Sequence, residues 1–354
     1  MGKQHTRYPE FTYEMETVVL ATHAMHTRFE IVLHGDNPVR LRSAGEEALR
    51  EIERLHSQLS LFEPTSDISR INAHAASHPV QVEPRLYNLL KYCAHLSELT
   101  EGAFDITIGE LMHIWGFHCG ETEVPETRTL QLLSQATNSR GVILCGPNMQ
   151  GSSCSETPTV RFERPGIRLD LGAIGKGYAI ERAVEILRDV GIVSAIIHGG
   201  TSTVYGVGTQ PNGEPWRVGV RTLGGDRSSA FDCQSCDDIH KEPYATPIEH
   251  VLGDTRPTNR SRSAGSLTVF ELTDSALSVS KTFGRRQVHD GVVYGHELDP
   301  RTGQPIQEAL TAIVTGPSPT ECDALSTALV VLGDSGVDLI RDRFPGYQAM
   351  MEHA

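Results

Sequence analysis

Apolar positions recur along the chain with two spacings, which predict helices and strands in alternation. A spacing of three to four residues predicts helices at 46–61, 84–100, 127–137, 178–190 and 319–332. Short apolar runs rich in β-branched residues predict strands at 17–20, 28–33, 140–145, 159–162, 167–171, 194–197, 204–208, 216–221, 266–272, 276–279 and 311–316. We therefore expect an α/β (α+β) fold of mixed sheets flanked by helices, with a ligand cleft where the polar segments converge.

The stretch Leu169-Asp-Leu-Gly-Ala-Ile-Gly-Lys-Gly-Tyr178 places three glycines before a helix that should end at Gly191 with a left-handed cap. One interpretation is that the glycines only permit a tight turn. The other is an anion site, because the first N–H groups of a helix are unpaired and its dipole favours negative charge. Lys176 adds a positive charge, and Asp170 stands where a strand should end. Since neither the P-loop nor the G-x-G-x-x-G spacing is present, the stretch indicates only a phosphate or nucleotide near Lys176.

The predicted helix at 319–332 carries polar residues on an otherwise apolar sequence. Asp323 and Thr327 are four residues apart and share one face, and Ser326 is adjacent. Carboxylate and hydroxyl oxygens are hard donors that suit Mg²⁺. The alternative is an acidic residue that merely complements the helix dipole.

Composition excludes some classes of function. The 354 residues include 31 basic and 45 acidic side chains, a net charge of −14, which argues against a nucleic-acid-binding surface. No run of about 18 apolar residues indicates a transmembrane segment, and residues 1–16 lack the apolar core of a signal peptide. We expect a flexible N-terminus over 1–16 and a single domain over 17–345 with a polar insertion at 222–262.

The seven cysteines are odd in number and irregularly spaced, which predicts reduced thiols and a cytoplasmic protein. Cys233 and Cys236, with His240 and His250 beyond, lack the second ligand pair of a zinc knuckle. We therefore favour a flexible loop over a metal site in this insertion.

Four further motifs accompany the central stretch in a fixed order. They are Gly102-Ala-Phe-Asp-Ile-Thr107, Trp115-Gly-Phe117, Asp299-Pro-Arg-Thr-Gly303 and Asp323-Ala-Leu-Ser-Thr-Ala-Leu329. Together, over roughly residues 17–332, they resemble the FAD:protein FMN transferase (ApbE) family. The resemblance implies an ApbE-like fold with a central nucleotide cleft. It also implies Mg²⁺-dependent transfer of the FMN moiety of FAD to a Thr or Ser hydroxyl of an acceptor protein, with release of AMP.

The family motifs also imply roles for individual residues. The metal would be bound by Asp323, Thr327, Ser326 and the Ala173 carbonyl. The residues expected to contact or line the FAD site are Met25, Phe62, Ala103, Phe104, Asp105, Asp170, Lys176 and Glu297. The N–H groups of 175–178 would hold a phosphate.

His296 stands at the place of the histidine that precedes the Asp-Pro-Arg-Thr-Gly turn in the family. The resemblance implies that it acts with Asp323 in catalysis, as the acid/base group. A neutral imidazole accepts a proton near pH 7, which fits this role. The alternative is a hydrogen bond that only stabilises the turn.

Six positions depart from the family pattern: His26 for a glycine, Thr201 for an aspartate, Val279 for a hydroxyl residue and Lys281 for a glycine in the Ser278–Lys281 segment, Glu297 for an apolar residue and Glu181 for an aspartate. These changes keep two further hypotheses open. One is a non-transferring FAD-binding carrier or sensor. The other is a FAD pyrophosphatase that gives FMN and AMP.

Overall fold

The computed structural model describes residues 15–118, 124–146, 157–221, 248–250, 267–282, 286–289 and 292–353. The expected flexible N-terminus before residue 15 and most of the expected insertion at 222–262, including Cys233 and Cys236, lie outside these residues. In the described part, no helix has both the length and the apolar composition that a bilayer crossing requires.

A seven-stranded sheet forms the centre of the structure, in the order β1-β2-β6-β7-β11-β16-β17. Its strands are Glu16–Ala24, Thr27–Gly35, Ser194–Gly199, Thr203–Gly208, Ser275–Lys281, Leu310–Gly316 and Gln348–His353. All six neighbouring pairs are antiparallel. The α/β (α+β) class is confirmed, but every pair of strands in the described sheets is antiparallel, so these sheets are not mixed.

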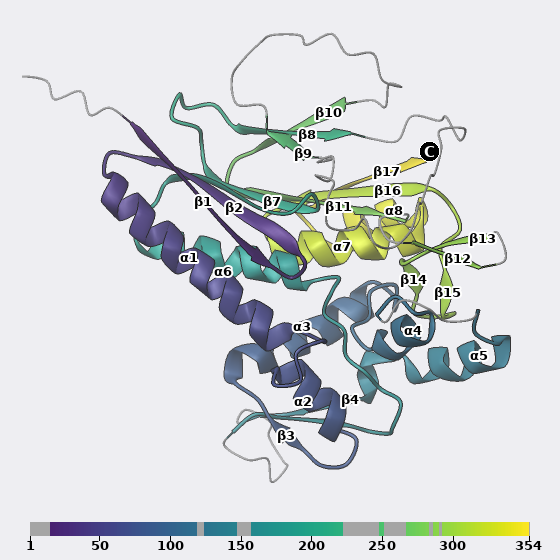
Figure 1. Ribbon diagram of the computed structural model, residues 1–354. Coiled ribbons are helices and arrows are strands. Elements are labelled where there is room, and N and C mark those ends of the chain that lie inside the picture. Colours follow the sequence, from purple (N-terminus) through teal and green to yellow (C-terminus); the bar gives the residue numbers. More distant parts are fainter. Residues whose placement is uncertain are drawn as a thin grey trace, which may run out of the picture.

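Helices cover one face of this sheet and a small sheet covers the other (Figure 1). On the first face lie α1 (Pro38–Leu59), α6 (Gly175–Asp189) and α7 (Pro319–Leu332), with α8 (Ser335–Arg343) beyond. The small sheet has the order β10-β8-β9, from Leu267–Leu272, Trp216–Arg221 and Ile248–His250. Val204, Trp216 and Leu277 are among the buried residues that fill the space between the two sheets.

The remaining elements form a second layer under the helices (Figure 1). Its helices are α2 (Asp67–His74), α3 (Pro84–Leu99), α4 (Gly109–Ile114) and α5 (Thr127–Ala136), and its sheet is β3 (Val80–Gln81), β5 (Thr159–Phe162) and β4 (Val142–Cys145). Two short hairpins, β12 (Arg286–His289) with β13 (Val292–Gly295) and β14 (Leu298–Asp299) with β15 (Gln304–Pro305), lie beside α7 and α5.

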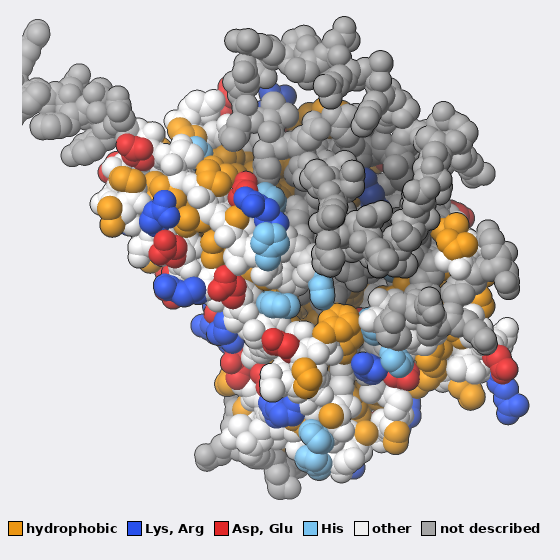
Figure 2. All heavy atoms as spheres, in the orientation of Figure 1, with side chains coloured by type: hydrophobic (Ala, Val, Ile, Leu, Met, Phe, Trp, Pro, Cys, Tyr) orange, Lys and Arg blue, Asp and Glu red, His pale blue; other side chains and the backbone are white. Residues whose placement is uncertain are grey.

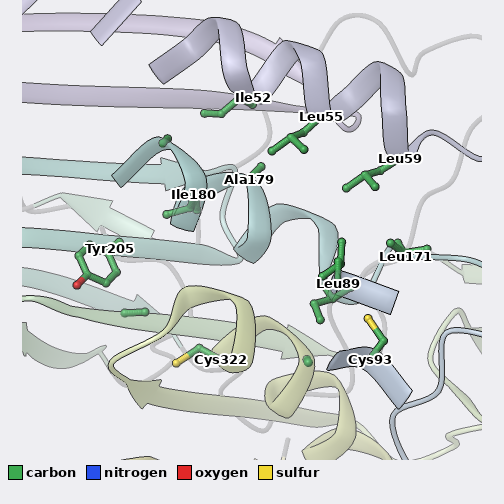
Figure 3. Close-up of a cluster of buried hydrophobic side chains, with 14 of the residues drawn as sticks. Ile52, Leu55, Leu59, Leu89, Cys93, Leu171, Ala179, Ile180, Tyr205 and Cys322 are labelled. Atoms are coloured by element: carbon green, nitrogen blue, oxygen red, sulfur yellow. The ribbon is translucent and has the colours of Figure 1, made fainter. Parts of the chain in front are cut away.

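One continuous core joins the helices to the sheet and to the second layer. Figure 3 shows Ile52, Leu55 and Leu59 on successive turns of α1, near Ala179 and Ile180 of α6. These spacings of three and four residues place one face of each helix inward. The helical period that predicts both elements therefore also determines which side chains meet.

Helix boundaries follow capping residues more closely than apolar periodicity. Helix α1 begins at Pro38, eight residues before the predicted start, because the Asn37 side chain accepts a hydrogen bond from the Arg40 N–H and proline suits the first helical position. The predicted left-handed cap of α6 is confirmed, since Gly191 has φ +73° and its N–H donates to the Arg188 carbonyl.

The structure differs from three further expectations. Residues 167–171 are not a strand in a sheet: an isolated parallel bridge from Ile108 to Arg168 and the side chain of Asn72 hold the segment instead. Strand β17 pairs with β16 beyond the expected domain end at 345. Cys145 is disulfide-bonded, so the expectation of reduced thiols is wrong there, whereas Cys93 and Cys322 are free and buried.

We predict that Gly177→Ala destabilises the protein by forcing α6 away from α7. A Cβ atom at this position would lie 2.2 Å from the Pro319 carbonyl oxygen and 2.7 Å from the Asp323 Cβ. Overpacking of this kind costs about 1–3 kcal/mol or more of unfolding free energy, which urea unfolding measures. Gly175→Ala, on the same helix, is the matched control because its nearest neighbour is the Met25 sulfur at 3.7 Å. Equal stability of the two variants would contradict the prediction.

Candidate functional site

The start of α6 and the second turn of α7 meet at one buried carboxylate. Asp323 Oδ2 accepts a hydrogen bond from the Gly177 N–H at 2.9 Å, and Oδ1 accepts one from the Thr203 hydroxyl at 3.0 Å. Lys176 Nζ lies 3.7 Å from Oδ1, and the Asp323 side chain is only 3% exposed. The absence of a side chain at Gly177 allows this approach. The structure therefore brings together two segments that are 146 residues apart.

A group of hydroxyls extends from Asp323 along α7 and β11. Thr203 Oγ1 lies 3.1 Å from Ser278 Oγ, which lies 3.2 Å from Ser326 Oγ. Ser280 Oγ lies 2.9 Å from Ser326 Oγ and 3.3 Å from Thr327 Oγ1. Because each hydroxyl both donates and accepts, the network satisfies polar groups at a place where several are fully buried.

The oxygen atoms around Asp323 fit a hard divalent cation. Ala173 lies in the turn before α6, two residues before the start of that helix. One carboxylate, the Ala173 carbonyl and the Thr327 hydroxyl are donors of the kind that Mg²⁺ prefers. The described residues contain no group of three or more His, Cys, Asp or Glu side chains placed to bind a metal.

The backbone at the start of α6 differs from the expected phosphate cradle. The Gly175 N–H donates to the Leu171 carbonyl at 2.8 Å, the Tyr178 N–H donates to the Ile174 carbonyl at 3.0 Å, and the Gly177 N–H is held by Asp323. The expectation that all four N–H groups of 175–178 hold a phosphate is therefore wrong for these three. The Lys176 ammonium is the anion-binding group that this turn does offer.

Asp170 is held by contacts within the protein, and its expected contact with FAD stays a prediction. Its Oδ1 accepts a hydrogen bond from the Gly172 N–H at 2.7 Å, and its Oδ2 lies 2.9 Å from His118 Nε2. Burial opposes ionisation, but the hydrogen bonds and charge of His118, with the Gly172 N–H and Arg168, hold the pKa of this carboxyl below its ordinary value. Asp170 is therefore an ionised, fixed element of the turn.

Three side chains gather beside this turn. Met25 and His26 form the β1–β2 hairpin turn with φ of +50° and +58°, and the Met25 sulfur is the nearest neighbour of Gly175. The Phe62 ring lies edge-on to His26 at 5.4 Å and to His118 at 5.7 Å between centroids. Phe62 is 51% exposed, so an aromatic ring stands uncovered next to the turn. In the view of Figure 2, several histidine side chains (pale blue) reach the surface near the middle of the molecule.

The motif at 102–107 serves the core in this structure. Ala103 and Phe104 are each 1% exposed. Asp105 accepts hydrogen bonds from the Ser97 hydroxyl and from the backbone N–H groups of Thr107 and Ser139. This satisfies a buried carboxylate entirely from within the protein. The expected contacts of these three residues with FAD stay a prediction.

His296 and Glu297 lie after β13, next to an anchored turn. His296 Nε2 is 3.3 Å from Glu297 Oε1. In the turn that follows, the Gly303 N–H donates to the Asp299 carbonyl at 2.7 Å. The Trp115 indole N–H donates to the Gly303 carbonyl at 2.8 Å and ties the turn to the end of α4. The sequence motifs Trp115-Gly-Phe117 and Asp299–Gly303 are thus parts of one structural unit.

Sequence reasoning missed Asn72, His118 and Thr203. The Asn72 amide pairs with both backbone groups of Leu169, at 2.9 and 2.7 Å, as a neighbouring strand would. The sequence does hint at Asn72, because it is a polar residue directly after the apolar Ile68 and Ile71, which are buried on helix α2. Thr203 and His118 carried no such signal, because each depends on a partner far along the chain.

A hollow of about 740 Å³ lies elsewhere, lined by Arg217, Phe270, Asp274, Gly316 and Gln348 among others. It adjoins the start of β11 and the end of β16. Ser280, which belongs to the hydroxyl network, is near the opposite end of β11. This hollow is therefore separate from the Asp323 cluster.

The fold and this cluster define an α/β protein with a charged, oxygen-rich centre at the start of one helix. A family model described as the ApbE family matches residues 25–351. The chain belongs to the ApbE family, since the match covers nearly all of it.

Relatives and solved structures agree with this assignment. The FAD:protein FMN transferase of Treponema pallidum (strain Nichols) is 28% identical over 312 residues, which are 88% of this chain and 77% of that protein. The protein of the same name from Vibrio cholerae serotype O1 is 26% identical over 288 residues, which are 80% and 72%. The crystal structure of the ApbE protein from Thermotoga maritima matches with a TM-score of 0.72 at 25% identity, over 96% of this chain and 97% of that one.

We predict that the Asp170 carboxylate makes stability depend on acidity. Because its pKa is lowered on folding, its contribution is present above the unfolded value of about 4 and is lost as the pH falls through the folded value. Urea unfolding of the wild type at pH 7 and at pH 3 should show this loss. Asp170→Asn should lose less stability over the same interval, and parallel profiles for the two proteins would refute the assignment.

Proposed function

We propose that this protein transfers the FMN moiety of FAD to a Thr or Ser hydroxyl of an acceptor protein, with Mg²⁺, and releases AMP. The observation that carries the proposal is the meeting of Asp323 with the Lys176 ammonium and the Gly177 N–H at the start of α6. The proposal is also supported by the names of similar proteins, several of which are called FAD:protein FMN transferase. A diphosphate ester needs positive charge at its oxygens, and this cluster supplies the groups for it.

The residues that would hold the Mg²⁺ ion are Asp323, Thr327, Ser326 and the Ala173 carbonyl. When bound, this ion neutralises charge on the diphosphate oxygens. The Lys176 ammonium is 23% exposed and rests between the Gly172 carbonyl, at 3.2 Å, and Asp323. From this place the ammonium would reach an oxygen of the FAD diphosphate by rotation of the Lys176 side chain.

The acceptor hydroxyl must lose its proton as its oxygen bonds to the FMN phosphorus. In the same step the bond from that phosphorus to the bridging oxygen breaks, and AMP leaves with that oxygen. We assign the proton to the imidazole of His296, whose ring is oriented by Glu297 Oε1 at 3.3 Å from Nε2. Phe62 and Met25 are the proposed contacts of the ring systems of FAD, since both lie beside the α6 turn.

The proposed acceptor is a protein and not a nucleic acid, because the net charge of −14 argues against a nucleic-acid-binding surface. The cytoplasm remains the predicted location. The Cys145 disulfide counts against it, because disulfides persist in oxidising compartments.

One assay separates this function from its alternatives. The protein is incubated with FAD, Mg²⁺ and a candidate acceptor, and AMP release is measured together with flavin fluorescence on a denaturing gel. AMP with protein-bound flavin supports the transferase. AMP without bound flavin supports a pyrophosphatase, and FAD binding with neither product supports a carrier or sensor.

We predict that Asp323→Ala lowers turnover by about a hundredfold or more, because it removes the only carboxylate of the proposed metal site. The measurement is the rate of AMP release at increasing Mg²⁺. Asp338→Ala is the matched control, since its side chain is 69% exposed on α8. Unchanged turnover and Mg²⁺ dependence in the Asp323 variant would rule out the assignment.

We also predict that His296→Gln lowers kcat by about 10²–10⁴-fold while FAD affinity changes little, because general base catalysis acts in the transfer step. FAD affinity is measured by flavin fluorescence in the absence of acceptor. If the variant transferred FMN at the wild-type rate, His296 would be a turn-stabilising residue only.

A further inference from the structure

His118 lies in the same network as the proposed site, although no family motif places it there. Its side chain is 8% exposed, and its Nε2 lies 2.9 Å from Asp170 Oδ2. Because Asp170 is ionised, the proton of this hydrogen bond belongs to His118 Nε2. The other ring nitrogen, Nδ1, is buried and has no hydrogen-bond partner among the residues that the structure describes.

An unpartnered buried nitrogen opposes folding, because the atom loses its hydrogen bonds to water, and native proteins retain few such atoms. Stability alone therefore does not account for an imidazole at position 118. If position 118 only had to be filled, an apolar side chain would serve as well as an imidazole. The hydrogen bond to Asp170 is therefore what the imidazole contributes.

The contacts continue from Asp170 to the charged cluster. Asp170 Oδ1 accepts the Gly172 N–H at 2.7 Å, and the Gly172 carbonyl accepts a hydrogen bond from Lys176 Nζ at 3.2 Å. Lys176 in turn lies 3.7 Å from Asp323 Oδ1. The exposed Phe62 ring lies perpendicular to the His118 ring, with 5.7 Å between centroids. The His118 imidazole thus lies between the exposed Phe62 ring and the turn that supports the Lys176 ammonium.

We propose that His118 is a positioning residue that holds the Asp170 carboxylate and thereby fixes the Gly172 turn on which the Lys176 ammonium rests. The inference rests on the proposed function, because Lys176 is there assigned to the diphosphate of FAD. His118 touches neither substrate nor metal in this role. Its effect is on nucleotide affinity, through Lys176, and not on the transfer step.

The test compares His118→Leu, which has no donor, with His118→Gln, whose amide nitrogen occupies the place of Nε2. FAD affinity is measured by flavin fluorescence without acceptor and with EDTA, so that no turnover occurs. His118→Leu should weaken binding about tenfold, the effect of one lost charge-assisted contact. His118→Gln should stay within about threefold of the wild type, because it restores the hydrogen bond to Asp170.

A double-mutant cycle with Lys176→Met distinguishes positioning from a merely structural role. If His118 acts through Lys176, the double variant His118→Leu with Lys176→Met binds FAD no more weakly than Lys176→Met alone. Additive losses overturn the proposal, as does wild-type affinity in His118→Leu. If His118→Leu does not fold, His118→Asn replaces it in the cycle, because its shorter amide cannot reach Asp170.

A crystal structure of the folded variant gives a result that needs no nucleotide. The Gly172 turn should shift and Lys176 Nζ should leave Asp323 when the donor at position 118 is lost. An unmoved turn refutes the positioning role even if the protein transfers FMN. A moved turn in a protein that releases no AMP retains the positioning role and rejects the proposed function.

Discussion

The close approach of α6 to α7 at Gly177 is the constraint on which the charged centre depends. Only a residue without a side chain allows the Asp323 carboxylate to accept the Gly177 N–H at 2.9 Å. That hydrogen bond satisfies one of the N–H groups that every helix start leaves unpaired. It also places Lys176, one residue earlier, within 3.7 Å of the same carboxylate. A single backbone contact therefore sets the geometry of both charges.

The rest of the fold holds these two helices in place. Helix α6 packs between α1 and α7, and α7 packs against β11 and β16 of the central antiparallel sheet. Because the hydroxyls of Ser278 and Ser280 come from β11, the sheet also supplies one wall of the polar network. Buried polar groups stabilise a fold only when each has partners. The network meets this condition around Asp323, whereas His118 Nδ1 does not meet it.

The sequence allowed much of this fold to be predicted, but unevenly. Helices such as α3 and α6 follow a strong 3.6-residue period, so their existence and approximate ends could be predicted. The early start of α1 depends on one side-chain cap at Asn37. Strand β17 at the chain end and the 167–171 segment depend on partners far away in sequence, Leu310–Gly316 and Asn72 respectively. Local patterns carry no information about such partners.

The same distinction separates the parts of the candidate site. Asp323, Thr327 and Lys176 lie in motifs whose chemistry is visible locally, and the structure brings Asp323 and Lys176 together. Thr203 and His118 contact acidic residues 120 and 52 positions away, so only the folded chain reveals them. His118 lies beside the Asp170 carboxylate, and the Lys176 ammonium lies beside that of Asp323. In the proposed site, a cation at Asp323 would share this carboxylate with an ammonium group, and an anionic ligand that draws Lys176 away would favour the cation. Nucleotide and metal affinities of the proposed site would then be coupled through this one lysine.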